Sequence, residues 1–201
     1  QDTPIALTAI TASTIEDLDI KNVVDMAGIS PNVMLVETPS NNTSATIAMR
    51  GGVTINPAIT WEPTVGVYLD GVYLGKTQGA IFDVVDLERV EILRGPQGTL
   101  YGRNTLGGAI NLISQRPNGS GIETKLTLGN YGLTQAQFIS DFELAEGTYG
   151  KLVVNSKERD GYVHNAPGPY GGAQGVVPSA DPTVNELDTI NSHGFRFTIA
   201  R

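Results

Sequence analysis

The chain has 201 residues, of which 17% are charged, and carries a formal charge of -8 at pH 7. Nucleic-acid binding is disfavoured, because neutralising phosphates requires a basic face and the 13 lysine and arginine residues are spread thinly along the chain. With no cysteine, the sequence excludes disulfide scaffolds, thiolate metal sites and thiol nucleophiles.

The first third of the chain combines helix signals with short β-type runs. Ser13 and Glu16 have the spacing of a capping box, which predicts one or two short helices that end near Gly28 and Pro31. Beyond Pro31, clusters of glycine, proline and asparagine separate four predicted strands, at residues 33–36, 46–49, 65–69 and 90–93.

A hairpin is the most specific local prediction. Asp70-Gly71 lies between two β-type runs, and this dipeptide favours a two-residue turn because both positions tolerate a positive φ. Residues 82–88 are interpreted as a helical turn that leads into the next strand. Residues 1–118 are therefore predicted to form one small α+β domain with many glycine-dependent turns.

From residue 122 onward, apolar and polar residues alternate. Four segments show this pattern, at residues 122–128, 136–144 and 149–159 and from Phe195 onward. Two short connections, 129–132 and 145–147, contrast with the 30-residue stretch 161–190. No apolar run is long enough to cross a bilayer as a helix, a test that transmembrane β-strands escape. The pattern fits a transmembrane barrel, but a soluble antiparallel sheet has the same period and is favoured on these segments alone.

No residue set for catalysis, phosphate binding or metal binding is found. Gly75-Lys76-Thr77 resembles the end of a P-loop, but the first glycine of that motif would stand where Asp70 lies. His164 and His193 are the only two histidines and have no cysteine beside them, so no zinc site is predicted. A Gly-x-Ser-x-Gly elbow is absent as well. The chain is therefore predicted not to be an enzyme and to carry no cofactor.

Glycines are unusually dense between the strand that ends at Leu93 and the strand that begins at Ala109. The five glycines of this series are Gly95, Gly98, Gly102, Gly107 and Gly108. Such density predicts a tightly folded element built mostly from loops, because glycine allows a positive φ and close backbone approach. The composition fits a ligand-binding loop and a turn-rich structural core equally well.

Several short motifs follow one another in a fixed order along the first 118 residues. They are a D-G-V hairpin, E-R-V-E-I-L-R-G-P, L-Y-G and G-G-A-I-N, at residues 67–72, 88–96, 100–102 and 107–111. Further matching pieces lie upstream, at residues 3–5, 25–27, 31–33 and 46–51. This series strongly resembles the plug domain of TonB-dependent outer-membrane receptors.

The resemblance implies a mainly β fold, in which a small α+β plug with a short mixed sheet and short helices occupies residues 1–118. The alternating segments of 119–201 would then be about the first four antiparallel strands of a transmembrane barrel, which in this family has about 22 strands. Connections 129–132 and 161–190 would face outside, and 145–147 would be a periplasmic turn. Because too few residues remain to close such a barrel and no TonB box precedes Gln1, the sequence is expected to be a fragment or part of a longer chain.

By this resemblance, the function is TonB-energised uptake of a scarce solute across the outer membrane of a Gram-negative cell. A ferric siderophore is the favoured ligand, and a carbohydrate or another large nutrient is the alternative. The expected partners are a TonB-type energy-coupling protein, whose box would lie upstream of Gln1, outer-membrane lipid and the nutrient, with no nucleic acid. A soluble β-rich binding module is the alternative from another class.

In such receptors the ligand binds where the plug apices meet the barrel outside, which implies residues 51–63 and 74–80 here. The side chains expected to face the ligand are Asn56, Trp61, Tyr73, Lys76 and Gln78. Trp61 is the only tryptophan, and its ring could stack on a sugar or a chelate ring or pack on the hairpin.

Arg50 and Arg94 resemble the two plug arginines that pair with barrel glutamates in this family. Guanidinium suits such a pair because it stays charged and grips a carboxylate with two parallel hydrogen bonds. The resemblance implies that both partners lie in the barrel. The alternative for each arginine is a surface charge near a turn.

Overall fold

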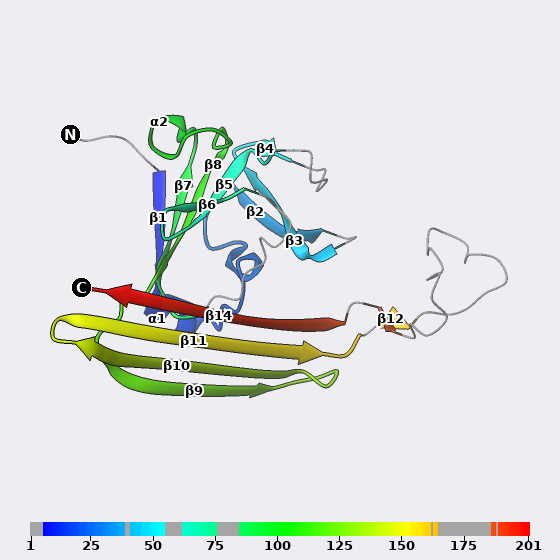
Figure 1. Ribbon diagram of the computed structural model, residues 1–201. Helices are drawn as coiled ribbons and strands as arrows, with labels where there is room; N and C mark the ends of the chain where they lie inside the picture. Colours follow the sequence, from blue (N-terminus) through cyan, green and yellow to red (C-terminus); the bar gives the residue numbers. More distant parts are fainter. Residues whose placement is uncertain are drawn as a thin grey trace. The chain divides into compact units, whose positions relative to one another are not determined.

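The computed structural model describes residues 6–38, 41–54, 62–75, 85–161, 163–164, 186–187 and 189–201. The chain divides into two compact units, Gln1–Gln115 and Arg116–Arg201. Strands dominate both units (Figure 1), so the prediction of a mainly β chain is confirmed. Within the described ranges, no helix is both long and apolar enough to cross a membrane.

Unit 1 is built on a mixed sheet of five strands in the order β1-β7-β8-β5-β6. Strands β5 and β8 run parallel, and the other neighbours are antiparallel. The strands are β1 (Ala6–Thr11), β5 (Val65–Leu69), β6 (Val72–Leu74), β7 (Leu87–Arg94) and β8 (Gly108–Ser114).

The described residues of unit 1 also form a smaller antiparallel sheet and three short helices. The sheet consists of β2 (Val33–Thr38), β3 (Asn41–Met49) and β4 (Gly52–Val53), and the helices are α1 (Ala12–Asp17), the 3-10 helix η1 (Val24–Met26) and α2 (Gly98–Tyr101). All four strands predicted for this part of the chain are present, as are two short helices before Gly28.

The core of unit 1 lies between one face of the mixed sheet and the smaller sheet. Ile92 on β7 and Ile110 on β8 lie directly opposite each other in the sheet, so their side chains point to the same face. They pack with Leu35 and Met49 of the smaller sheet, and each of these side chains is at most 1% exposed. Burying such a side chain stabilises the fold by about 1.5 to 3 kcal/mol, which explains why the two sheets stay together.

Two local predictions for unit 1 are wrong. Helix α1 is capped by Thr11, whose hydroxyl accepts a hydrogen bond from the Thr14 N–H at 3.4 Å, and Ser13 lies inside the helix. The cap falls two residues earlier because strand β1, which the sequence did not predict, delivers the chain to Thr11 in an extended conformation. The predicted helical turn at 82–88 is contradicted at its end, since β7 already begins at Leu87. Residues 82–84 lie outside the described residues.

Unit 2 is a four-stranded antiparallel sheet in the order β14-β11-β10-β9. Its strands are β9 (Ser120–Leu128), β10 (Thr134–Ala145), β11 (Thr148–Arg159) and β14 (Ile190–Ala200). Two further residue pairs form the short ladder of β12 (Val163–His164) and β13 (Glu186–Leu187). Each of the four alternating segments of the sequence is therefore a strand of this sheet.

The two faces of the unit 2 sheet differ in polarity. On one face, Phe138, Val154 and Phe195 lie opposite one another on neighbouring strands and remain 38%, 38% and 83% exposed. On the other face, Lys151 Nζ lies 3.3 Å from the Asp141 carboxylate, and the Lys151 side chain is buried. The alternation in the sequence thus separates an exposed apolar face from a polar face.

Candidate functional site

Of the five side chains predicted to face a ligand, Tyr73 alone lies within the described residues. Asn56, Trp61, Lys76 and Gln78 lie outside them. Tyr73 stands on β6 opposite Tyr68 of β5, and the two ring centroids are 5.3 Å apart. Its hydroxyl accepts a hydrogen bond from Asn104 Nδ2 at 3.0 Å. Tyr73 is therefore half-buried in an aromatic cluster of unit 1, and its contact with a ligand stays a prediction.

The aromatic cluster is held together by Tyr68. This side chain is 5% exposed, donates a hydrogen bond from its hydroxyl to the Tyr101 carbonyl at 2.6 Å, and meets the Tyr101 ring edge-on at 4.9 Å. Burial raises the pKa of Tyr68, with smaller contributions from Tyr73 and Tyr101. Burial also raises the pKa of Tyr101, assisted by the negative charge of Glu91. Both phenols therefore remain protonated near neutral pH, as a hydrogen-bond donor requires.

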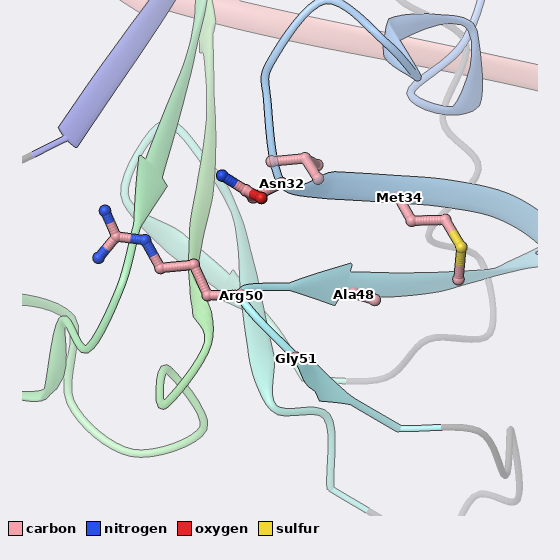
Figure 2. Close-up of a pocket in the computed structure, with 6 residues that line it drawn as sticks. Asn32, Met34, Ala48, Arg50 and Gly51 are labelled. Atoms are coloured by element: carbon pink, nitrogen blue, oxygen red, sulfur yellow. The ribbon is translucent and has the colours of Figure 1, made fainter.

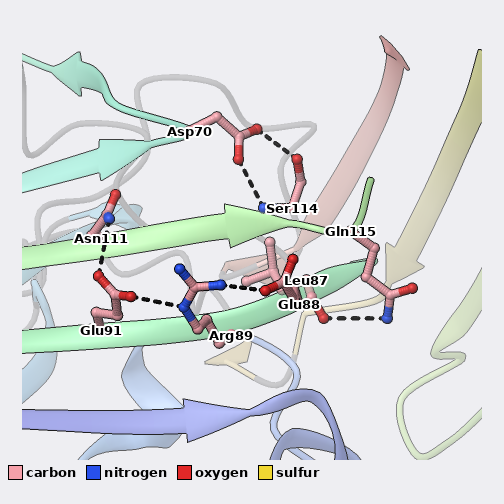
Figure 3. Close-up of polar contacts among 8 residues, drawn as sticks. All are labelled: Asp70, Leu87, Glu88, Arg89, Glu91, Asn111, Ser114 and Gln115. Carbon is pink, nitrogen blue, oxygen red and sulfur yellow. Dashed lines mark hydrogen bonds and ion pairs between the residues drawn. The ribbon is translucent and has the colours of Figure 1, made fainter. Parts of the chain in front are cut away.

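Three acidic side chains of unit 1, those of Asp70, Glu88 and Glu91, contact neighbours in the same unit (Figure 3). Asp70 accepts hydrogen bonds from the Ser114 N–H at 2.8 Å and from the Ser114 hydroxyl at 2.6 Å. Glu91 accepts hydrogen bonds from Arg89 Nε at 2.7 Å and from Asn111 Nδ2 at 3.3 Å. These carboxylates stabilise the sheet and leave little capacity for an external cation.

Arg50 and Arg94 lie at one corner of unit 1, although they come from different sheets. Arg50 follows β3 at the turn into β4, and its N–H donates to the Asn32 carbonyl at 3.2 Å. Arg94 is the last residue of β7, and its Nη1 donates to the carbonyl of Pro31, the residue before Asn32, at 3.3 Å. The segment that leads into β2 thus holds both arginines. We call this group the arginine corner: Arg50, Arg94, Pro31 and Asn32.

A shallow hollow of about 330 Å³ adjoins the arginine corner. Its lining consists of Asn32, Val33, Met34, Ala48, Arg50 and Gly51. In Figure 2 the Arg50 side chain extends from the end of β3 away from Met34. The hollow therefore combines an apolar wall with a guanidinium at its edge.

The charges of the arginine corner are not neutralised within the described residues. No carboxylate there forms an ion pair with Arg50 or Arg94, whereas Arg89 pairs with Glu88 and Glu91. The Arg94 Nε is also buried without a hydrogen-bond partner. Because a buried donor without an acceptor costs about 1 to 3 kcal/mol, the corner is suited to receive a carboxylate from elsewhere. No group of three or more potential metal ligands occurs in the described part of the chain.

The sequence indicated both arginines but not the residues that position them. Pro31 and Asn32 act through their carbonyl groups, which carry no signal in the residue type. The sequence did carry a signal for the turn that contains Arg50: glycine in a two-residue turn, here Gly51, is typical of a hairpin.

The sequence matches one protein family and several known relatives. The family model "TonB-dependent Receptor Plug Domain" matches residues 1–109. The pesticin receptor of Yersinia pestis is 32% identical over 114 residues, which cover 57% of this chain and 16% of that protein. The catecholate siderophore receptor Fiu of Escherichia coli K12 is 34% identical over 134 residues, covering 64% of this chain and 16% of Fiu. The matching segment thus spans about a sixth of the length of these relatives.

Solved structures show the same fold. The ferric yersiniabactin uptake receptor FyuA from Yersinia pestis superposes with a TM-score of 0.75 at 23% identity, covering 97% of this chain and 28% of FyuA. The open form of the ferric-catecholate import receptor Fiu from E. coli K12 superposes with a TM-score of 0.61 at 28% identity, covering 79% of this chain and 22% of Fiu. At 23% identity the likeness to FyuA shows the fold alone.

Proposed function

The chain belongs to the TonB-dependent receptor family, whose plug domain its residues 1–109 match, and from this premise we propose that it is part of an outer-membrane receptor for TonB-energised solute uptake. In this proposal residues 1–118 form the plug, and residues 119–201 form about the first four strands of the surrounding barrel. The role is binding and transport, not catalysis. The observation that carries the proposal is the plug fold of unit 1, followed directly by a sheet with one exposed apolar face.

The unit 2 sheet supports contact with outer-membrane lipid. Ile122, Leu128 and Phe195 share the apolar face and are 75%, 71% and 83% exposed. An apolar face of this extent is unfavourable in water, and lipid chains would cover it at no such cost. The opposite face, with its Lys151–Asp141 pair, is suited to the barrel interior.

A ferric siderophore is the proposed ligand. Relatives that match the chain are a pesticin receptor and a catecholate siderophore receptor, and the Fiu structure, at 28% identity, is that of a ferric-catecholate import receptor. Another relative, the vitamin B12 transporter BtuB of Vibrio vulnificus, is 28% identical over 77% of this chain, so a large nutrient of another kind is the alternative. Asn56, Trp61, Tyr73, Lys76 and Gln78 are proposed to face the ligand.

The arginine corner is proposed to join the plug to the barrel. Arg50 and Arg94 would each receive a glutamate from the barrel wall, which supplies the charge that the described residues lack. We further propose that the receptor binds a TonB-type energy-coupling protein on its periplasmic side.

An uptake assay tests the proposal directly. The complete receptor is produced in a Gram-negative strain that lacks its own siderophore receptors, and uptake of radioactive iron is measured with ferric siderophores of the catecholate, hydroxamate and phenolate classes. We expect uptake of one class, which disappears when the energy-coupling protein is deleted. Accumulation that persists without the coupling protein would contradict energised transport. Uptake of vitamin B12 or an oligosaccharide, with none of iron, would reassign the ligand but not the mechanism.

A further inference from the structure

Four of the five glycines in the series between β7 and β8 fall into two groups according to their surroundings, and Gly95 is a separate case. A Cβ added at Gly98 or Gly102 would meet nothing within 4 Å. A Cβ at Gly107 would lie 3.2 Å from the Met49 carbonyl oxygen, and one at Gly108 would lie 2.6 Å from Met49 Sδ and still closer to the Leu93 carbonyl. The second group therefore serves close packing between the two sheets, which favours the structural interpretation of this glycine series at these positions.

Gly95 is crowded by a charged side chain. A Cβ at this position would lie 2.8 Å from Arg50 Nη1 and 3.6 Å from Arg50 Cζ. Real Cβ contacts are essentially never this short, so any other residue at position 95 would require the Arg50 guanidinium to move to a new position. The Gly95 backbone cannot easily retreat, because its N–H donates to the Gly107 carbonyl at 2.9 Å.

We propose that Gly95 is the positioning residue for Arg50: the missing side chain lets the guanidinium lie across the backbone directly after Arg94. Arg94 is then held by the Pro31 carbonyl, while the Arg50 guanidinium lies in the space beside Gly95, the residue after Arg94. The inference rests on the proposed role of Arg50 and Arg94 in joining the plug to the barrel. It adds that the direction of Arg50 is set by a residue of another sheet.

The planar shape of guanidinium fits this arrangement. A flat group can lie against a backbone without a Cβ, and its outer edge remains able to donate two parallel hydrogen bonds to a carboxylate. A methyl group at position 95 would force the guanidinium aside by a few tenths of an ångström or more, which is enough to spoil a two-bond contact.

A double-mutant cycle in the complete receptor tests this inference. The variants are Gly95→Ala, Arg50→Ala and the combination, and the measurement is the rate at which a protease cleaves the plug in outer-membrane preparations, which reports how often the plug opens. Gly95 has a φ of +105°, so alanine is also strained by the backbone alone. Gly28→Ala is the matched control, since Gly28 has a φ of +86° and nothing within 4 Å of its added Cβ.

We expect Gly95→Ala to accelerate cleavage about tenfold more than Gly28→Ala, because the displaced Arg50 guanidinium loses a charged hydrogen bond to the barrel. In the Arg50→Ala receptor the methyl group has free space, so Gly95→Ala should then cost no more than Gly28→Ala. Equal effects of Gly95→Ala in the two backgrounds would overturn the inference.

The two proposals fail in different ways in this experiment. If Arg50 does not join the plug to the barrel, Arg50→Ala alone leaves cleavage and siderophore uptake unchanged, and Gly95→Ala then acts like Gly28→Ala in both backgrounds. If Gly95 does not position Arg50, Arg50→Ala still loosens the plug but the two substitutions act independently.

Discussion

Two hairpins of unit 1 share one turn geometry and use it for different purposes. The turn between β3 and β4 has Arg50 and Gly51 at φ values of 49° and 82°, and the turn between β5 and β6 has Asp70 and Gly71 at 49° and 81°. Aspartate tolerates a left-handed φ because its short side chain can bond locally, whereas arginine has no such advantage. The backbone requirement is therefore the same in both turns, and only one of them has the residue that local preference favours.

The side chains explain the difference. The Asp70 carboxylate accepts two hydrogen bonds from Ser114 within unit 1, so its role is structural. The Arg50 guanidinium lies over Gly95 with no carboxylate partner among the described residues. A residue that violates a local preference without a local gain marks a position retained for function. The comparison thus supports two roles: the arginine corner serves contact with a group outside unit 1, and the Asp70 turn stabilises unit 1 itself.

Replacing Arg94 by alanine should have the largest effect. With the plug–barrel pairing proposed above, the substitution would leave a barrel glutamate buried without its partner, at a cost of about 3 to 5 kcal/mol. The plug should become much more sensitive to protease, measured in outer-membrane preparations. Arg103→Ala is a suitable control, because the Arg103 side chain is 81% exposed and, among the residues that the structure describes, its ion pair is with Glu62 at 3.7 Å. Unchanged protease resistance of the Arg94 variant would refute the assigned role.

Replacing Asp70 by alanine should destabilise the plug by about 2 to 3 kcal/mol. The substitution leaves the Ser114 N–H and hydroxyl without acceptors at a site where Ser114 is 8% exposed. Chemical denaturation of the complete receptor, followed by a probe in the plug, measures the loss. Asp70→Asn keeps a residue that tolerates the turn and one acceptor, so it should recover part of the stability. An alanine variant as stable as the native protein would remove the structural role.

Replacing Tyr68 by phenylalanine should cost about 1 to 1.5 kcal/mol, because the Tyr101 carbonyl loses its donor. The pH dependence sharpens this prediction. Burial raises the pKa of Tyr68 in the folded state, so the stability it contributes is complete below the pKa of the unfolded chain and is lost as the pH rises through the folded pKa. Stability profiles measured above about pH 9 should therefore fall more steeply for the native protein than for Tyr68→Phe.

Of the four substitutions, Arg50→Asn should change the stability of the plug the least. Asparagine favours the left-handed φ of 49° found there, so the hairpin should gain about 0.5 to 1 kcal/mol. Siderophore uptake should nevertheless fall, since the guanidinium is lost. Parallel measurements of uptake and of β3–β4 hairpin stability by hydrogen exchange separate the two effects. If uptake survives in this variant, the role of Arg50 in contact with a group outside unit 1 is wrong.

Much of the fold was accessible from local patterns, and the candidate site only in part. The hairpin at Asp70-Gly71 and the alternating strands of unit 2 follow from turn chemistry and from a period of two, which neighbouring residues specify. Strand β1 escaped prediction because its six residues gain their extended form by pairing with β7, far along the chain. Tyr73 was expected at a ligand, but its described contacts are those of an aromatic cluster that three separate segments build.

The sequence by itself determined the motif order of the plug, the turn at Asp70 and the separation of polar and apolar faces in unit 2, since each depends on residues close together in the chain. Only the tertiary structure decided that the Arg50 guanidinium lies over Gly95 and that Pro31 holds Arg94. These contacts join segments that adjoin different sheets. Their geometry therefore exists only after the core between the sheets has packed and has brought the C-terminal ends of strands β3 and β7 to one corner.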